Sequence, residues 1–179
     1  YRRVLELAKL HRDEIKRRYP NIPRRVSGYN LDELLDPEKV NLAKLIVGSE
    51  GTLATVVESK LALVPIPQAT GLAVLHFGGL LPALETGCEI LELEPSAVEL
   101  IDRMVIELAR ESLEYTRRLH FIEGEPHALL VVEFNGENRT AVVAKMDALE
   151  TLIGNQARPM IRILDPVEQF NVWKVRKAA

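Results

Sequence analysis

The pattern of apolar and polar positions changes along the chain from a helical period to a strand-like one. Residues 1–18 carry apolar side chains three and four positions apart, which predicts an amphipathic helix. A second, short helix is predicted over residues 38–47. Residues 53–65 are rich in Val, Leu and Thr, and therefore predict a β-strand. The Pro-rich segment PIPQA (65–69) predicts a linker, with a domain boundary close to position 67.

The remainder of the chain alternates between strand and helix patterns. Strands are predicted over residues 70–77, 96–100, 127–135 and 158–164. Helices are predicted over residues 79–92, 101–112, 138–153 and 166–177. Two successive strand–helix–strand units predict a four-stranded antiparallel sheet with helices on one face. The fold class is therefore α+β, with a ferredoxin-like layer in the second part of the chain.

Composition and charge narrow the class of protein. Of the 179 residues, 47% are hydrophobic and 27% charged, and the net charge is −3, as in a soluble globular protein without affinity for nucleic acid. No apolar run reaches the length of a transmembrane helix. The single cysteine, Cys88, excludes an internal disulfide and predicts a reducing, cytoplasmic location. Because Cys88 lies within a helical apolar pattern, we expect a small core residue and not a nucleophile.

The remaining titratable residues form no catalytic or metal-binding pattern. Four histidines lack the spacing of metal ligands and are interpreted as structural or surface residues: His11, His76, His120 and His127. A group of glutamates is interpreted as a solvated helix face: Glu89, Glu92, Glu94 and Glu99. We therefore predict neither a catalytic residue nor a metal site within this chain.

The most distinctive stretch is GSEGT, residues 48–52, which lies just before the first predicted strand. From the residues alone, two interpretations are open. Gly48 and Gly51 can form a turn with positive φ, with Glu50 facing solvent and Thr52 hydrogen-bonding locally. Alternatively, the glycines expose backbone N–H groups and the hydroxyls add donors, so that the loop cradles phosphates or a flavin edge. The stretch has neither the Gly-Lys-Ser/Thr of a Walker loop nor the strand–loop–helix order of a Rossmann fingerprint.

Longer segments around this loop resemble the FAD-linked oxidases related to vanillyl-alcohol oxidase, in particular the glycolate oxidase and D-lactate dehydrogenase branch. LIVGSEGTLATVVESKLALVPIP resembles the end of that family's FAD-binding (PCMH-type) domain, and PRRVSGYNLDELL resembles its Ser/Thr-Gly-Tyr-Asn/Asp-Leu segment. VELIDRMVIELAR and DPVEQFNVWKVRKAA resemble the cap domain that follows, the latter with a Trp-x-x-Arg helix. Together the four segments span nearly the whole chain.

The resemblance implies a domain organisation and a set of site residues. Residues 1–67 would be the C-terminal part of the FAD-binding domain, and residues 68–179 a truncated substrate-side cap domain. Arg176 would bind the carboxylate of a 2-hydroxy acid, a role that suits its planar guanidinium. The residues implied beside FAD are Gly28, Tyr29, Asn30, Gly48, Ser49, Glu50, Gly51 and Thr52. Taken alone, Tyr29 is equally well a packing residue, and Arg176 a surface charge.

The resemblance also implies an activity, and the residues leave an alternative. The implied enzyme oxidises a glycolate- or D-lactate-type acid by hydride transfer to FAD and passes electrons to an acceptor protein or quinones. A homodimer, a peripheral location at the inner membrane and a fused iron–sulfur domain belong to the same expectation. The family's glycine-rich segment and its His-x-His-Gly-Asp-Gly-Asn segment are absent and the chain begins with Tyr1, so an inactive fragment is expected. The alternative is a ferredoxin-like small-molecule-binding or oligomerisation module, which predicts a self-complementary apolar sheet face or edge.

Overall fold

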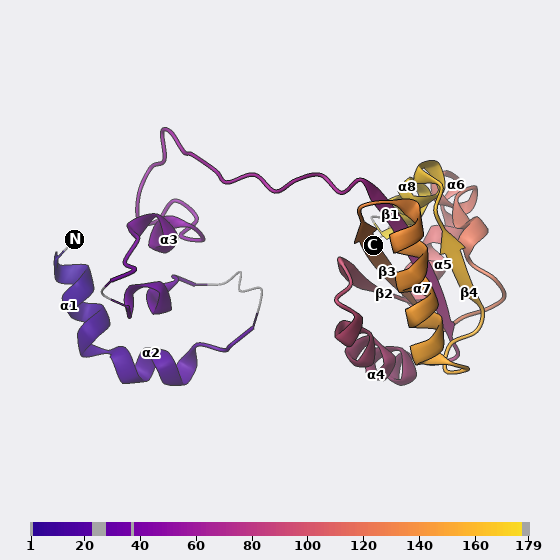
Figure 1. Ribbon diagram of the computed structural model, residues 1–179, viewed down its shortest axis with the longest axis horizontal. Helices are drawn as coiled ribbons and strands as arrows, with labels where there is room; N and C mark the ends of the chain where they lie inside the picture. Colours follow the sequence, from indigo (N-terminus) through magenta and orange to yellow (C-terminus); the bar gives the residue numbers. More distant parts are fainter. Residues whose placement is uncertain (1, 23–27, 37, 177–179) are drawn as a thin grey trace. The chain divides into compact units, whose positions relative to one another are not determined.

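The computed structural model describes residues 2–22, 28–36 and 38–176, which divide into two compact units, 1–63 and 64–179 (Figure 1). The first unit contains α1 (Arg2–Leu10), α2 (Arg12–Arg18), the 3₁₀ helix η1 (Leu31–Leu34) and α3 (Leu42–Ile46). The helix predicted over residues 1–18 is thus interrupted at His11, whose φ and ψ are −101° and 17°. The interruption lets both α1 and α2 contact η1. Ala8, Leu34 and Leu45 form the small core of this unit.

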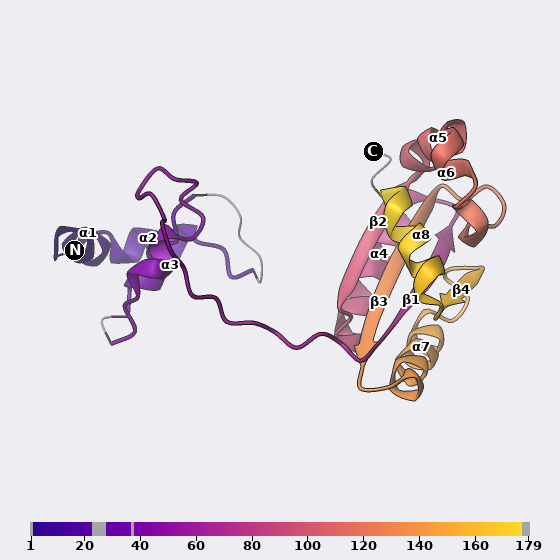
Figure 2. The same ribbon diagram turned by 90° about the horizontal axis from the view of Figure 1, so that it is seen from above.

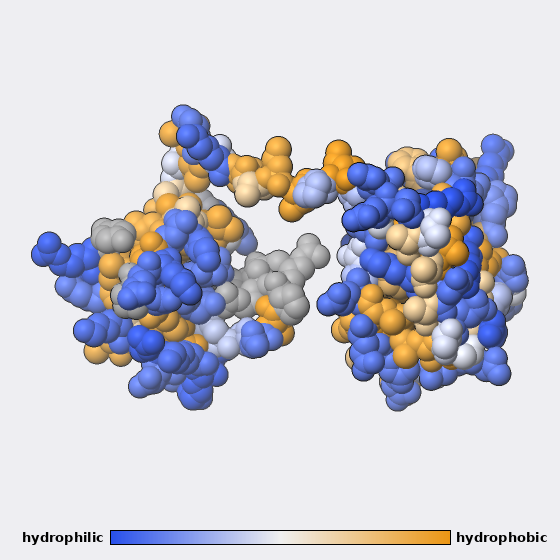
Figure 3. Space-filling view, in the orientation of Figure 1, coloured by the Kyte–Doolittle hydropathy of each residue, from blue (hydrophilic) through white to orange (hydrophobic). Residues whose placement is uncertain are grey.

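The strand predicted over residues 53–65 is wrong. The described chain is irregular from position 53 to position 68, and its apolar side chains are exposed, with Val57 95% and Leu63 91% exposed. Figure 3 shows apolar side chains gathered along this segment. The residue types favour an extended backbone, but a strand also requires a hydrogen-bonded neighbour. The described part of the first unit offers no other strand to pair with.

The second unit is built on one antiparallel sheet with strand order β2-β3-β1-β4 (Figure 2). Its strands are β1 (Ala69–Phe77), β2 (Ala97–Asp102), β3 (Ala128–Gly136) and β4 (Met160–Ile163). Its helices are α4 (Leu80–Ile90), α5 (Arg103–Glu111), α6 (Leu113–Thr116), α7 (Arg139–Ile153) and α8 (Pro166–Val175), with the 3₁₀ helices η2 (Leu91–Leu93) and η3 (Leu119–Phe121). This strand order is that of the ferredoxin-like fold, and it confirms the predicted α+β class and antiparallel sheet.

Helices cover both faces of the sheet, which corrects the expectation of helices on one face (Figures 1 and 2). Ala73 and Leu75 of β1 pack with residues of α4 and α7 in one core. Leu72 and Val74 of the same strand pack with residues of α5, η3 and α8 in a second core. Adjacent residues of a strand point to opposite faces, so a strand that is apolar at every position is buried on both sides. The run GLAVL in β1 has no polar side chain and therefore indicates burial on both sides.

Polar side chains explain why three helices begin close to the predicted positions. The side chains of Asp102, Asn138 and Asp165 accept hydrogen bonds from backbone N–H groups in the first turns of α5, α7 and α8. These bonds satisfy N–H groups that have no acceptor within the helix. One expectation for α4 is wrong, because Cys88 is exposed and not part of the core. Its helical position faces away from the sheet, as the buried residues of α4 are Ala83, Thr86 and Ile90.

His76 is the most deeply buried titratable side chain among the described residues, with 3% of its surface exposed. Its Nε2 accepts a hydrogen bond from the N–H of Glu123 at 3.1 Å, so Nε2 carries no proton. Nδ1 therefore carries the proton and donates it to the carbonyl of Pro159 at 2.9 Å. Burial lowers the pKa of His76 because the imidazolium would lose its hydration. The neutral ring joins β1 to two loops.

This burial predicts that acid destabilises the second unit. An unfolded histidine binds a proton below about pH 6.5, whereas folded His76 resists protonation until lower pH. Its contribution to stability is therefore complete above about pH 6.5 and is lost as the pH falls towards the folded-state pKa. We expect His76→Gln to flatten the dependence of the unfolding free energy on pH between about 7 and 5. His120→Gln, at an exposed position, is the control and should keep the wild-type slope. If the unfolding free energy of the wild-type chain and of both variants had the same dependence on pH, the assignment of this dependence to His76 would be wrong.

Candidate functional site

The stretch at residues 48–52 forms a tight turn with unusual backbone angles. Glu50 and Gly51 have successive positive φ values of 52° and 78°, and the N–H of Thr52 donates to the carbonyl of Ser49 at 2.9 Å. These are features of a type I′ turn. Gly48 also has a positive φ, of 82°. The turn predicted for the two glycines is thus present, and Glu50 is a non-glycine residue in the left-handed region, where strain concentrates at functional sites.

The structure brings the two predicted flavin-side segments together, although about twenty residues separate them. The Asn30 amide donates to the carbonyls of Lys44 and Val47, both at 3.0 Å. The Thr52 hydroxyl donates to the carbonyl of Ser49 at 2.6 Å, so the Tyr29 hydroxyl is the donor in its 2.8 Å bond to Thr52 Oγ1. Asn30 thus holds the segment that leads into the turn, at Lys44 and Val47, and Tyr29 holds Thr52 at the end of the turn.

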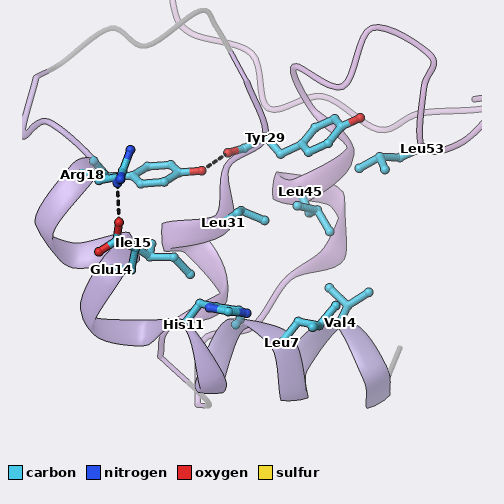
Figure 4. A pocket seen from close by; sticks show the side chains of 12 residues that line it. Val4, Leu7, His11, Glu14, Ile15, Arg18, Tyr29, Leu31, Leu45 and Leu53 are labelled. Atoms are coloured by element: carbon cyan, nitrogen blue, oxygen red, sulfur yellow. Dashed lines mark hydrogen bonds and ion pairs between the residues drawn. The ribbon is translucent and has the colours of Figure 1, made fainter.

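An apolar pocket of about 500 Å³ adjoins this turn within the first unit. Figure 4 shows Tyr29 and Leu53 at one side of it and α1 and α2 at the other. Tyr19 also lines the pocket, and its hydroxyl donates to the carbonyl of Tyr29 at 2.6 Å. The apolar lining comes from α1, α2, η1, α3 and the turn: Val4, Leu7, Ala8, Ile15, Leu31, Leu45 and Leu53. A groove of this size and character is suited to bury further apolar groups.

Arg176 lies in the second unit and follows the last residue of α8. Its Nη1 is 3.2 Å from Oε1 of Glu99 on β2, and its side chain is 56% exposed. Three residues earlier on the helix, Trp173 packs against the second core, with its indole close to Glu133 of β3. Burial raises the pKa of the Glu133 carboxyl, and the nearby Trp173 indole partly opposes this effect. The Arg176 guanidinium is thus available for an anion, although its Nη1 is paired with Glu99.

Comparison with known proteins identifies the family. The family described as FAD linked oxidases, C-terminal domain, matches residues 66–179. The chain belongs to the FAD-linked oxidases. A D-2-hydroxyglutarate dehydrogenase from Pantoea ananatis is 28% identical over the whole of this chain and 19% of the relative's length. A D-2-hydroxyglutarate dehydrogenase from Escherichia coli is 27% identical over 83% of this chain and 15% of the relative. The mitochondrial D-lactate dehydrogenase [cytochrome] 1 of Saccharomyces cerevisiae is 28% identical over 78% of this chain and 24% of the relative.

This FAD-linked oxidase chain spans about a fifth of the length of such relatives. FAD is the cofactor of the family. The turn at residues 48–52 fits one part of a flavin site, because the N–H of Ser49 donates to Ile46 and that of Thr52 to Ser49, which leaves the N–H groups of Glu50 and Gly51 at an exposed turn. A Cβ at Gly51 would have no atom within 4 Å, so the space above the turn is open. Backbone donors at such a turn can bind carbonyl or phosphate oxygens.

Two acidic residues on the sheet face under α8 are not predicted from the sequence of this FAD-linked oxidase. Glu99 was assigned to a solvated helix face, but it lies on β2 and pairs with Arg176. Glu133 was not singled out at all. The signal was present, because Glu133 interrupts the apolar run LLVVEF in a strand that is buried at its neighbouring positions. A carboxylate within such a run requires a partner in the fold.

Across the described residues, no helix is long and apolar enough to cross a membrane.

Proposed function

We propose that the whole protein is an FAD-linked dehydrogenase that oxidises a small 2-hydroxy acid of the glycolate, D-lactate or D-2-hydroxyglutarate type. The family match over residues 66–179, which ends in the Trp-x-x-Arg helix, is the observation that carries this proposal. The relatives described above bear the names of dehydrogenases of two such acids. When bound, FAD supplies the acceptor for the hydride that leaves the substrate's α-carbon.

In this proposal the residues of this chain bind and orient, and the catalytic base lies elsewhere in the protein. Arg176 binds the substrate carboxylate, since a guanidinium offers paired N–H donors and remains charged at all relevant pH values. The segments Gly28–Asn30 and Gly48–Thr52 would lie beside the flavin, with the backbone N–H groups of Glu50 and Gly51 as donors to it. The domain boundary near position 67 separates the flavin-binding part from the cap. Electrons then pass to an acceptor protein or quinones, and a homodimer, an iron–sulfur domain and a cytoplasmic location belong to the same proposal.

Two features support a piece of an enzyme over a self-standing oligomerisation module. In the part of the chain that the structure describes, helices cover both faces of the sheet, so neither face is left open for self-association. Exposed apolar side chains gather along residues 53–66 and line the pocket of the first unit, as expected where other parts of a flavin domain pack, and others lie on helices of the second unit, among them Leu81 and Leu113.

Flavin reduction in the full-length protein tests the proposal. The purified protein should contain FAD, and anaerobic addition of glycolate, D-lactate or D-2-hydroxyglutarate should bleach its visible absorption. L-Lactate and the corresponding 2-oxo acids serve as controls, because neither presents a D-configured C–H bond for hydride transfer. The proposal would be refuted if the protein bound no flavin, or if dithionite bleached the flavin while all of the 2-hydroxy acids failed.

A further inference from the structure

Helix α8 lies over one face of the sheet (Figure 2). A stripe of residues with spacings of three, four and seven positions runs along the helix to Arg176, the residue that follows it. The stripe consists of Gln169, Val172, Trp173 and Arg176. Val172 is fully buried in the second core. The other three residues are polar or carry a polar group, and each contacts a different part of the sheet. The helix is therefore positioned by directed bonds as well as by apolar packing.

The first contact fixes the start of the helix on β4 and β1. The Gln169 side chain is 93% buried, and its Oε1 accepts from the Thr70 hydroxyl at 2.7 Å. Its Nε2 donates to the carbonyls of Thr70 at 3.0 Å and Ile163 at 3.3 Å. A buried amide with both of its ends bonded specifies one orientation, because any rotation leaves a buried polar group unpaired.

The next two contacts follow the sheet to its other edge. Trp173 interacts with Glu133 on β3, and Arg176 pairs with Glu99 on β2. Thr70 is opposite Asn135 of β3, and Glu99 is opposite Val131. The three contacts therefore fall at positions 135, 133 and 131 along β3, two residues apart on one face of the sheet. Helix α8 crosses the sheet diagonally, and Arg176 lies at its last contact.

The contact between Arg176 and Glu99 has a specific geometry. It uses Nη1 of the guanidinium and one carboxylate oxygen, at 3.2 Å. The Nε–Nη2 edge, which forms paired bonds with planar carboxylates, takes no part in it. Glu99 therefore restricts rotation of the guanidinium while it leaves one bidentate edge for a second anion. Lys174, the neighbouring cation, instead lies over the Phe170 ring at 5.2 Å from its centroid and does not share this contact.

We propose that Glu99 is a positioning residue for Arg176. This proposal rests on the proposed function, in which Arg176 binds the substrate carboxylate. Glu99 holds one edge of the guanidinium so that the other edge meets the carboxylate in one orientation.

Kinetics of the full-length enzyme test the role of Glu99. Glu99→Ala should raise the KM for the 2-hydroxy acid about tenfold and change kcat by less than about twofold, because a mobile guanidinium loses ground-state and transition-state binding alike. Glu99→Gln keeps an oxygen that accepts from Nη1 and should recover KM to within about threefold of wild type. Glu89→Ala removes an exposed carboxylate on α4, at the other face of the sheet, and is the matched control. An unchanged or lowered KM in Glu99→Ala would overturn the proposal.

A second measurement decides the proposal independently of turnover. In the 179-residue chain, the ¹⁵Nε relaxation of Arg176, identified by its loss in Arg176→Lys, should give an order parameter above about 0.8. Glu99→Ala should lower it below about 0.6, and Glu99→Gln should preserve it. A low value in the wild-type chain would overturn the positioning role. If no 2-hydroxy acid reduces the flavin, the proposed function fails, while this order parameter still shows whether Glu99 orders Arg176.

Discussion

Gly71→Val is expected to lower the unfolding free energy of the second unit by about 3 kcal/mol or more. Gly71 lies on β1 directly below α7. A Cβ at this position would be 2.5 Å from Met146 Cε, 2.6 Å from Val142 Cγ1 and 2.9 Å from Leu164 Cδ2. Met146 is flexible, but Val142 is branched and fully buried, so the helix itself would have to move. Glycine is therefore required here by the close approach of helix and strand.

Urea unfolding of the 179-residue chain, followed by the fluorescence of its single tryptophan, measures this effect. Trp173 lies on α8 and reports on the second unit alone. Gly71→Ala should cost less than valine, because only the Cβ must be accommodated. Gly78→Ala is the matched control, since a Cβ there has no atom within 4 Å, and it should change stability by less than about 0.5 kcal/mol. If Gly71→Val were as stable as wild type, the packing of α7 on β1 described above would be wrong.

Arg176→Met is expected to reduce kcat/KM of the full-length enzyme for its 2-hydroxy acid about 100-fold or more. The substitution keeps much of the side-chain volume but removes the charge and the paired donors, and loss of a charged pair with a carboxylate typically costs about 3 kcal/mol. Arg176→Lys should lie between wild type and methionine, because an ammonium restores the charge but not the bidentate geometry. Steady-state kinetics with the acid that reduces the flavin best would measure both losses.

Two controls separate substrate binding from damage to the fold or the flavin site. Arg139→Met removes an exposed guanidinium from the start of α7 and should leave kcat/KM unchanged. FAD content and flavin fluorescence should be the same in Arg176→Met and wild type, since Arg176 belongs to the second unit and the flavin-side segments to the first. A kcat/KM within threefold of wild type in Arg176→Met would show that another residue binds the carboxylate.

Sequence alone predicted the second unit well because its local signals agree with its packing. The helix predicted over residues 138–153 is α7 (Arg139–Ile153), and the strand predicted over 127–135 is β3 (Ala128–Gly136). In both cases a cap or a turn coincides with the change of hydrophobic period. Prediction from the sequence was less successful in the first unit, where the strand expected over residues 53–65 is absent. A strand is stabilised by residues distant in the sequence, and the composition of residues 53–65 cannot report whether such residues are near.

The candidate site also has features that the sequence predicted and features that it could not predict. Gly48 and Gly51 predicted a turn, because glycine has no Cβ and adopts the positive φ of such a turn readily. The approach of Tyr29 and Asn30 to that turn could be anticipated only from the family resemblance. The pairing of Arg176 with Glu99 could not be anticipated, since it depends on how α8 crosses the sheet. Side-chain partners across a sheet follow from topology and register, which periodicity does not specify.

The diagonal course of α8 limits how this region can change in evolution. Three side chains, at Gln169, Trp173 and Arg176, must meet three successive points of the sheet. One residue inserted between the first and the last would turn the guanidinium by about 100° around the helix axis, away from the strands. Variation in specificity at this place should therefore arise by exchange of side chains, whereas insertions and deletions should gather in the loops, and the seven-residue interval should behave as a fixed unit of length.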